Sequence, residues 1–142
     1  MFMKPFSGAK LALLFNDHLL TYKRDVKDTI PFPGCWDFAG GGREGDETPV
    51  ECALRELEEE FALRLSPERI EWRRSYPSVS HPGWEAWFLV GQLTQAEIDA
   101  IAFGDEGQYW KMMPIDEYLK HAEGVWYLQA RLRDYLAHAA QR

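Results

Sequence analysis

Residues 41–63 have the sequence GGREGDETPVECALRELEEEFAL, which carries the strongest structural signals in the chain. The first part is rich in glycine and polar residues, which indicates a loop whose backbone can lie close to a ligand. Thr48 is a favourable N-cap, Pro49 occupies the first helical position and Glu51 completes a capping box. The sequence therefore predicts a glycine loop followed by a helix from Pro49 to about Leu63.

Apolar and acidic side chains lie on different faces of this predicted helix. At about 100° per residue, the apolar residues form a narrow stripe that we expect to be buried: Val50, Leu54, Leu57 and Phe61. Among the acidic residues, Glu56 lies one helical turn from both Glu59 and Glu60. The small side chains of Cys52 and Ala53 lie one turn upstream on the same face and would leave room for a metal ion. Neighbouring carboxylates repel one another, and Mg²⁺, which binds oxygen ligands and phosphates, would relieve that repulsion. Glu-rich helices are also common solvated faces, so the cluster alone leaves both interpretations open.

The loop and helix together resemble the Nudix signature, G-x5-E-x7-R-E-U-x-E-E-x-G-U, in which U is a bulky aliphatic residue. Eight positions are in register with it, namely Gly41, Glu47, Arg55, Glu56, Leu57, Glu59, Glu60 and Leu63. Residues 36–40, WDFAG, resemble the family's lead-in strand. Ala39 stands where the family usually has proline, and Ala62 replaces the last glycine of the signature, but neither departure removes a carboxylate. So many fixed positions at set spacing make the match specific.

The resemblance implies a mixed α/β fold, the Nudix-type α/β/α sandwich with a mixed β-sheet, in a single domain over residues 1–142. It also implies Mg²⁺ as cofactor, with Mn²⁺ as a substitute. The expected metal ligands are the backbone carbonyl of Gly40 and the carboxylates of Glu56, Glu59 and Glu60. Glu47 and Arg55 resemble the ion pair that holds the signature loop against its helix.

The chemistry implied by the resemblance is in-line attack of water on a phosphorus atom within a P–O–P linkage, with a carboxylate as proton acceptor. Family members use either a signature glutamate, here Glu56, or a glutamate from a distal loop. Residues 104–108, GDEGQ, resemble that distal loop. We select Glu106 as second metal ligand or base, although a polar turn residue is an equally good interpretation.

Substrate contacts are predicted at the strand ends and the glycine loop. Lys23 and Arg24 end a predicted strand where relatives place phosphate-binding basic residues, although a charged strand end explains them equally well. Gly41 is expected to contact the substrate. Phe38 ranks first as a base-stacking side chain because it precedes the glycine loop, although aromatic residues at strand spacing are more often core residues. The other aromatic candidates are Trp36, Trp84, Trp87 and Tyr109.

Outside the signature, strand and helix patterns alternate without regular βαβ units, which favours a mixed sheet covered by helices on both faces. Strands are predicted over Lys10–Phe15, Leu19–Lys23, Cys35–Ala39, Ile70–Val79, Trp84–Leu93 and Gln108–Met112. Helices are predicted after a second capping box, Thr94 with Glu97, and over Pro114–Lys120 and Val125–Ala139.

Composition argues against several classes of protein. The net charge of −7, from 16 Lys and Arg against 23 Asp and Glu, disfavours a surface that coats a nucleic-acid polymer. No apolar run approaches the ~20 residues that a membrane helix needs, so we expect no membrane partner and a cytoplasmic location. Cys35 and Cys52 are expected to be free thiols, and the histidines to be turn or surface residues. The oligomeric state is left open.

The leading functional hypothesis is Mg²⁺-dependent hydrolysis of a nucleoside triphosphate, in normal or oxidised form, to a monophosphate and pyrophosphate. Relatives that act on ADP-ribose often carry an N-terminal dimerisation region, which is not evident here. ADP-ribose, a nucleotide-sugar or a dinucleoside polyphosphate are the alternative substrates. A non-catalytic, nucleotide-sensing Nudix domain is the alternative of another class, and the complete set of Glu56, Glu59 and Glu60 argues against it.

Overall fold

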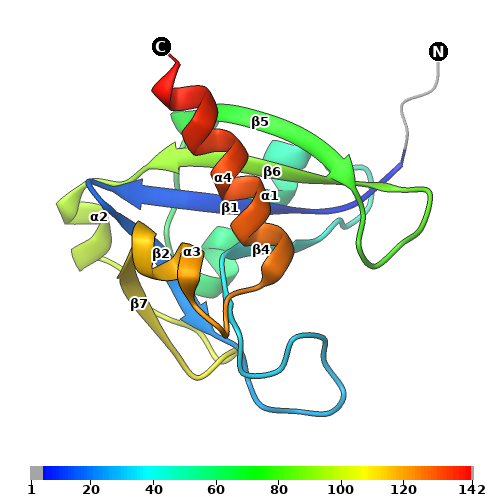
Figure 1. The fold of residues 1–142 in the computed structure, drawn as a ribbon, viewed down its shortest axis with the longest axis horizontal. Coiled ribbons are helices and arrows are strands. Elements are labelled where there is room, and N and C mark those ends of the chain that lie inside the picture. Colours follow the sequence, from blue (N-terminus) through cyan, green and yellow to red (C-terminus); the bar gives the residue numbers. More distant parts are fainter. Residues whose placement is uncertain (1–4, 142) are drawn as a thin grey trace.

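The structure is a computed structural model that describes residues 5–141. Its strands form one mixed sheet, in which the order along the main path is β3-β2-β1-β6-β5 (Figure 1). β4 pairs with β1, β7 pairs with β2, and β1 runs parallel to β6 while the other pairings are antiparallel. The strands are β1 (Phe6–Phe15), β2 (His18–Lys23), β3 (Trp36–Asp37), β4 (Ala39–Gly42), β5 (Ile70–Pro77), β6 (Glu85–Gln92) and β7 (Tyr109–Pro114).

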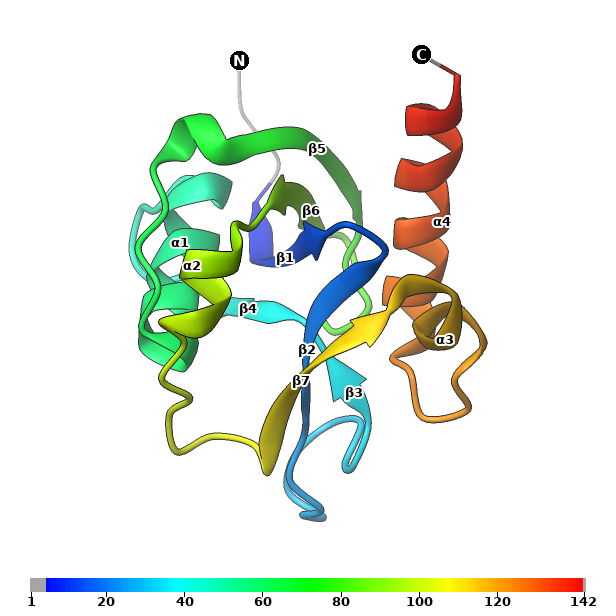
Figure 2. The ribbon, with the colours of Figure 1, turned by 90° about the vertical axis from the view of Figure 1, so that its left-hand side faces the viewer.

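Helices cover both faces of this sheet. Figure 2 shows α1 and α2 on one side and α3 and α4 on the other. Their bounds are α1 (Pro49–Phe61), α2 (Gln95–Asp99), α3 (Ile115–Lys120) and α4 (Trp126–Ala140), with one short 3-10 helix at Pro67–Arg69. The α/β/α sandwich with a mixed sheet that the sequence predicted is therefore confirmed. No helix within residues 5–141 combines the length and apolar character needed to cross a membrane.

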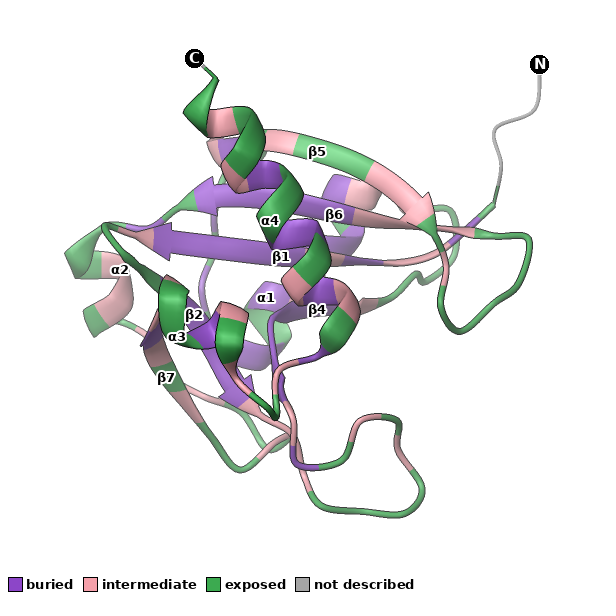
Figure 3. Cartoon of the chain, in the orientation of Figure 1, coloured by how far each residue is buried: buried purple, intermediate pink, exposed green. Residues whose placement is uncertain are grey.

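The central strand β1 is buried on both faces (Figure 3). Leu11 and Leu13 lie in the core between the sheet and α1, whereas Ala12 and Leu14 lie in the core on the side of α4. Successive side chains of a strand point to opposite faces, so this alternation follows directly from the apolar run in the sequence. The strand begins at Phe6 rather than at the predicted Lys10, because its first residues pair with β4 and β6.

The predicted strand over residues 35–39 is wrong as a single element. β3 ends at Asp37 and pairs with β2, whereas β4 begins at Ala39 and pairs with β1. The change of partner occurs at Phe38, whose backbone N–H donates to the Asp37 side chain at 2.7 Å instead of to a strand. As a result, the glycines after Ala39 are placed in the sheet, directly beside β1.

The signature helix begins as predicted. The Thr48 hydroxyl accepts a hydrogen bond from the Glu51 N–H at 3.2 Å, and the Glu51 carboxylate accepts one from the Thr48 N–H at 2.8 Å. Leu57 and Phe61 of the apolar stripe are fully buried. Cys52 is fully buried in the same core, as is its neighbour Ala53, so the expectation that they leave space for a metal ion is wrong. Their small side chains are packed between α1 and the sheet.

The helix ends at Phe61, two residues before the predicted end, because Ala62 is left-handed with φ 58° and ψ 30°. Its N–H still donates to the Glu58 carbonyl oxygen at 2.9 Å. A Cβ atom is unfavourable in this conformation, which is why helices are so often followed by glycine. The signature glycine that Ala62 replaces therefore has a backbone role in this fold.

We predict that Ala62→Gly raises the free energy of unfolding by about 1 kcal/mol, because glycine adopts the left-handed conformation without the Cβ penalty. Urea denaturation followed by circular dichroism measures the change. Ala130→Gly, at an exposed position within α4, is the matched control and should lower stability by about 0.5–1 kcal/mol. Destabilisation by both substitutions would contradict the role assigned to Ala62.

Candidate active site

The glycine loop is pressed between β1 and α1. Gly40 has φ 127°, and a Cβ atom there would lie 2.2 Å from the carbonyl oxygen of Ala9. At Gly41, a Cβ atom would lie 2.8 Å from the carboxyl carbon of Glu56. Gly40 is therefore required by its close approach to the backbone of β1, whereas a side chain at Gly41 would displace the Glu56 carboxylate, one of the predicted metal ligands.

The three carboxylates of α1 have different surroundings. Glu60 is buried, and its Oε1 accepts a hydrogen bond from the Gly40 N–H at 2.8 Å. Burial raises the pKa of Glu60 to about 8, against the opposing effect of Lys10. Burial also raises the pKa of Glu56, whereas the Glu59 side chain is 56% exposed. Two of the three groups are thus held where a negative charge is unfavourable without a nearby cation.

Arg55 connects the loop with the carboxylate face. Its Nε donates to Glu47 at 2.6 Å, so the predicted ion pair is present. Its Nη1 donates to Glu56 at 2.9 Å and to Glu59 at 3.1 Å, and its Nη2 donates to the Gly42 carbonyl oxygen at 2.9 Å. Hydrogen bonding to Arg55 lowers the pKa of Glu47. One guanidinium therefore holds the loop on the helix and partly neutralises two carboxylates.

The three predicted carboxylate ligands do not converge on one point. Within residues 5–141, no three His, Cys, Asp or Glu side chains are grouped as a metal centre. Arg55 draws two of the carboxylates toward itself, and Glu60 is turned toward Gly40. The available ligands are nonetheless all oxygen atoms on one helix face and its loop, which suits a hard divalent cation. Their assignment as metal ligands stays a prediction.

Behind the glycine loop lies a buried ionic network centred on Asp37. Its Oδ2 accepts hydrogen bonds from Lys10 Nζ at 2.9 Å, from Arg24 Nη1 at 2.9 Å and from the Tyr22 hydroxyl at 3.2 Å. Burial alone would raise the pKa of Asp37, but the attraction of Lys10 and Arg24, together with the hydrogen bonds from Lys10 and the Phe38 N–H, outweighs burial and lowers the pKa. Burial would likewise lower the pKa of Lys10, but the combined attraction of the acidic groups around it, of which Asp37 is the strongest, raises the pKa.

Lys10 also extends this network to the glycine loop. Its Nζ lies 3.4 Å from the Phe38 carbonyl oxygen and 3.3 Å from that of Gly40, the predicted backbone metal ligand. A carbonyl oxygen has two lone pairs, so this contact leaves one for another ligand. Lys10 and Asp37 were not predicted as site residues from the sequence. The available signal was a charged residue within each of two otherwise apolar segments.

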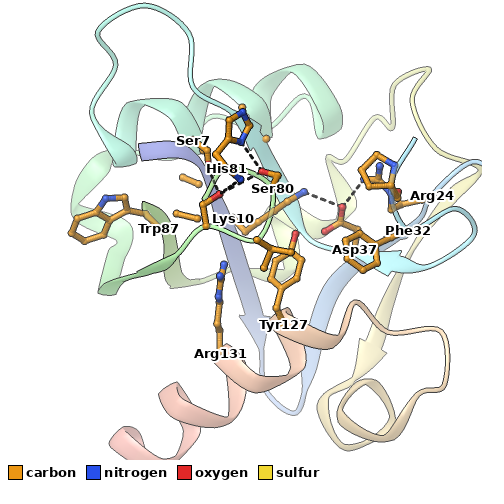
Figure 4. Close-up of a pocket in the computed structure, with 18 residues that line it drawn as sticks. Ser7, Lys10, Arg24, Phe32, Asp37, Ser80, His81, Trp87, Tyr127 and Arg131 are labelled. Atoms are coloured by element: carbon orange, nitrogen blue, oxygen red, sulfur yellow. Dashed lines mark hydrogen bonds and ion pairs between the residues drawn. The ribbon is translucent and has the colours of Figure 1, made fainter. Parts of the chain in front are cut away.

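A cavity of about 360 Å³ opens beside the loop (Figure 4). Gly41 and Gly42 form part of its wall, so it adjoins the carboxylate helix. This volume is within the usual range for small-molecule sites. Aromatic side chains contribute from three separate segments: Phe32, Trp87 and Tyr127. One polar border is a chain of hydrogen bonds through Ser7, Ser78, Ser80 and His81.

The two basic residues predicted to bind phosphate have different positions. Arg24 borders the cavity, but its guanidinium is engaged by Asp37 and by the Pro31 carbonyl oxygen at 3.0 Å. Lys23 does not border the cavity; its Nζ donates to the Gly34 carbonyl oxygen at 2.8 Å and to a Glu123 oxygen at 3.3 Å. The structure therefore brings Arg24, and not Lys23, to the candidate site.

The prediction that Phe38 stacks on a base is wrong. Phe38 has 0% exposure and packs against Tyr118 and Phe88 in the core on the side of α4. The strand change at Phe38 directs the ring into the protein, which leaves no face for a ligand. Of the other aromatic candidates, Trp87 borders the cavity, whereas Trp36 is buried.

The distal loop lies against the last turn of α1. The Gly104 N–H donates to the Glu60 carbonyl oxygen at 2.9 Å, and the Gly107 N–H donates to Asp25 Oδ2 at 3.2 Å. Glu106 is exposed and makes no hydrogen bond or ion pair with residues 5–141. The loop is therefore anchored close to the carboxylate helix, and the role of Glu106 stays a prediction.

The model of the NUDIX domain family matches residues 6–134, which include every strand, the glycine loop and α1. The chain belongs to the Nudix family. An RNA pyrophosphohydrolase of Xanthomonas campestris pv. campestris (strain B100) is 31% identical over 130 residues, and the alignment covers 75% of this Nudix chain and 60% of that protein. The chain spans less than two thirds of the length of the curated relatives that it matches.

Solved structures with the same fold have lower sequence identity. The MutT protein from Methanosarcina mazei Go1 has a TM-score of 0.75 at 16% identity and covers 98% of this Nudix chain and 99% of its own. A C. elegans Ap4A hydrolase binary complex has a TM-score of 0.68 at 18% identity, with coverage of 95% and 99%. At such identities the likeness establishes the fold alone.

We predict that Lys10→Met lowers the free energy of unfolding by about 3 kcal/mol, because it leaves the buried Asp37 carboxylate with Arg24 as its remaining cation. The lowered pKa of Asp37 means that its contribution to stability is present above its ordinary pKa of about 3.9 and is lost as the pH falls further. Denaturant titration at neutral pH measures the effect. Lys111→Met removes an exposed ion pair with Glu117 and should change stability by less than about 1 kcal/mol. Equal effects of the two substitutions would contradict the importance of the buried pair.

Proposed function

We propose that this Nudix protein hydrolyses a diphosphate linkage in a nucleotide, with a nucleoside triphosphate, in normal or oxidised form, as substrate. The products would be a nucleoside monophosphate and pyrophosphate. The observation that carries the proposal is the position of Gly41, which borders the aromatic cavity and also lies against Glu56. A nucleoside in the cavity would therefore have its phosphates beside the carboxylate face of α1.

Each group near the loop has a proposed role. Glu56, Glu59, Glu60 and the Gly40 carbonyl would hold Mg²⁺ or Mn²⁺, which when bound neutralises the diphosphate and lowers the pKa of water. Glu47 and Arg55 keep the loop on the helix, so that the Gly41 backbone can approach the substrate. Glu56 or Glu106 accepts the proton of the attacking water. Release of pyrophosphate as a leaving group completes the hydrolysis.

A second candidate substrate is the triphosphorylated end of an RNA chain. It is favoured by the relatives named RNA pyrophosphohydrolase, because such an end contains the same linkage. The net charge of −7 provides little general attraction for a polyanion, which favours the small nucleotide. ADP-ribose, nucleotide-sugars and dinucleoside polyphosphates remain as the other substrates to be compared.

The experiment is a substrate panel with the purified full chain. It compares normal and oxidised nucleoside triphosphates, ADP-ribose, a dinucleoside polyphosphate and a triphosphorylated RNA, each with Mg²⁺, with Mn²⁺ and with a chelator. We expect pyrophosphate release from nucleoside triphosphates that stops when the metal is chelated. Cleavage of the RNA alone would transfer the proposal to the second candidate, and no cleavage in any mixture would favour a nucleotide-sensing domain.

We predict that Glu59→Gln or Glu60→Gln lowers kcat by ~10³ or more, because each removes a charge proposed to hold the metal. At Glu60, glutamine retains an oxygen that accepts the Gly40 N–H, so folding should be preserved. Mn²⁺ binding, measured by electron paramagnetic resonance, should weaken in both variants. Glu58→Gln, at an exposed position on the same helix, is the control and should leave both measurements unchanged. A variant that keeps more than about a tenth of wild-type turnover at saturating Mg²⁺ would refute its assignment.

We predict that Glu106→Gln lowers kcat by ~10²–10⁴ with little change in melting temperature, because the side chain is exposed and makes no hydrogen bond or ion pair with residues 5–141. A pH–rate profile separates its two roles: loss of the acidic limb identifies the base, whereas a raised Mg²⁺ requirement with the limb retained identifies a ligand. Asp105→Asn is the neighbouring control. A kcat within about threefold of wild type, less than 1 kcal/mol in barrier, would return the role of base to Glu56.

A further inference from the structure

The cavity beside the glycine loop carries an excess of positive charge. Lys10, Arg24 and Arg131 line it, whereas Asp37 is the one carboxylate in its lining within residues 5–141. The carboxylates of α1 do not line it. With the histidine of the wall counted as neutral, one carboxylate leaves two of the three positive charges uncompensated. The net charge of the whole chain is −7, so the cavity is opposite in sign to its surroundings and would attract an anionic ligand.

Arg131 is the cation of this cavity that has no carboxylate partner. It extends from α4 to the border of the cavity, near Tyr127 (Figure 4). The residue is 5% exposed, and the ion pairs within residues 5–141 do not include it. Its hydrogen bond within the described chain runs from Nη2 to the Pro77 carbonyl oxygen at 3.2 Å. A buried arginine is normally paired with an anion, so the arrangement indicates that a ligand supplies the missing partner.

Two aromatic rings hold the guanidinium of Arg131 in place. Its central carbon lies 4.8 Å from the ring centroid of Tyr76 on β5 and 4.6 Å from that of Tyr127 on α4. Burial lowers the pKa of Arg131, yet a guanidinium remains protonated at neutral pH. The positive charge at this border of the cavity is therefore fixed in position by the fold.

N–H groups of both arginines remain for a ligand. Every fully buried side-chain nitrogen or oxygen atom within residues 5–141 has a hydrogen-bond partner. Nε and Nη1 of Arg131 have no such partner in the described chain, so they retain contact with solvent, which the cavity provides. Nη2 of Arg24 likewise has no partner there. Lys10 differs, because its Nζ already donates to Asp37 and to two carbonyl oxygens, so it contributes its charge alone.

The size of the charge excess favours a phosphate monoester over a carboxylate. A phosphate monoester carries about −1.5 to −2 charge at neutral pH, which matches two uncompensated cations, whereas a carboxylate carries a single charge. Phe32, Trp87 and Tyr127 line the same cavity. Such aromatic side chains contact the apolar surface of an organic ligand, so the phosphate belongs to a larger molecule.

We propose that the cavity binds a phosphate monoester on the part of the substrate that is remote from the hydrolysed diphosphate, and that Arg131 is the specificity-determining residue for this group. The substrate then has a diphosphate beside the carboxylate face of α1 and a separate phosphate in the cavity. A nucleotide phosphorylated on its ribose has this chemistry, as does a sugar with a diphosphate and a second phosphate. The inference rests on the proposed function, because that function places the retained part of the substrate in the cavity.

The first experiment measures binding of inorganic phosphate to the full chain without metal, by calorimetry in a chloride buffer. Wild type should bind phosphate about 10- to 100-fold more tightly than Arg131→Met, the loss expected for hydrogen bonds to a charged group. Arg133→Met, at an exposed position on the same helix, should bind phosphate as wild type does. Equal affinity of wild type and Arg131→Met would overturn the proposal, as would acetate binding as tightly as phosphate or no phosphate binding to wild type. If Arg131→Met fails to fold, phosphate should still shift the Arg131 Nε–H resonance of wild type in nuclear magnetic resonance spectra, and an unchanged resonance would overturn the proposal.

The second experiment compares hydrolysis, with Mg²⁺, of paired substrates that differ by one phosphate. The pairs are nucleoside triphosphates with and without a 2′- or 3′-phosphate, and a ribose 1-diphosphate with and without a 5-phosphate. In at least one pair, the extra phosphate should raise kcat/KM about tenfold or more, and the responding pair identifies the molecule that carries it. Arg131→Met should remove this advantage, whereas Arg133→Met should retain it. Hydrolysis without an advantage in any pair would overturn this inference and leave the proposed function standing. Phosphate binding that depends on Arg131, without hydrolysis of any substrate, would instead overturn the proposed function.

Discussion

The Asp37 carboxylate is the buried charge around which the candidate site is arranged. It is 3% exposed and satisfied by Lys10, Arg24 and the Tyr22 hydroxyl, which come from β1 and from β2 and its end. A buried carboxylate is tolerated only with such partners, so the strands that carry them cannot move independently. Lys10 then contacts the Gly40 carbonyl, and this places the glycine loop relative to the sheet.

Burial without enough positive charge also explains the raised pKa values on the carboxylate face of α1. Glu56 and Glu60 both have raised pKa values because they are buried near one another with insufficient positive charge. Arg55 compensates part of this charge at Glu56, whereas Glu60 accepts a hydrogen bond from the Gly40 N–H and is attracted by Lys10, and its pKa is still raised. A divalent cation on this face would supply the missing charge, and this supports the proposed metal dependence independently of the sequence signature.

The sequence predicted those features that depend on residues close together in the chain. The capping box at Thr48, the buried stripe around Leu57 and the Glu47–Arg55 pair depend on residues close together in the chain, and all three are present. Phe38 was misassigned because its direction depends on a change of strand partner, which pairs distant segments. Arg131, a buried residue of α4 that borders the cavity, was missed because a charged residue beside a leucine stripe is normally solvated. Its guanidinium lies against the ring of Tyr76 on β5, which is distant in the chain.

The proposed reaction and the proposed substrate preference depend on different kinds of sequence signal. The groups proposed for hydrolysis lie mainly on one loop and one helix, so the reaction class can be inferred from a short motif. The cavity is assembled from β1, β6, α4 and the segments near residues 31 and 80, which are far apart in the chain. Substitutions at cavity positions in these segments can change the cavity without changing the sequence of α1 and its loop. Proteins that share this fold can therefore share the chemistry and differ in substrate, and substrate preference must be argued from cavity residues such as Phe32, Trp87 and Tyr127.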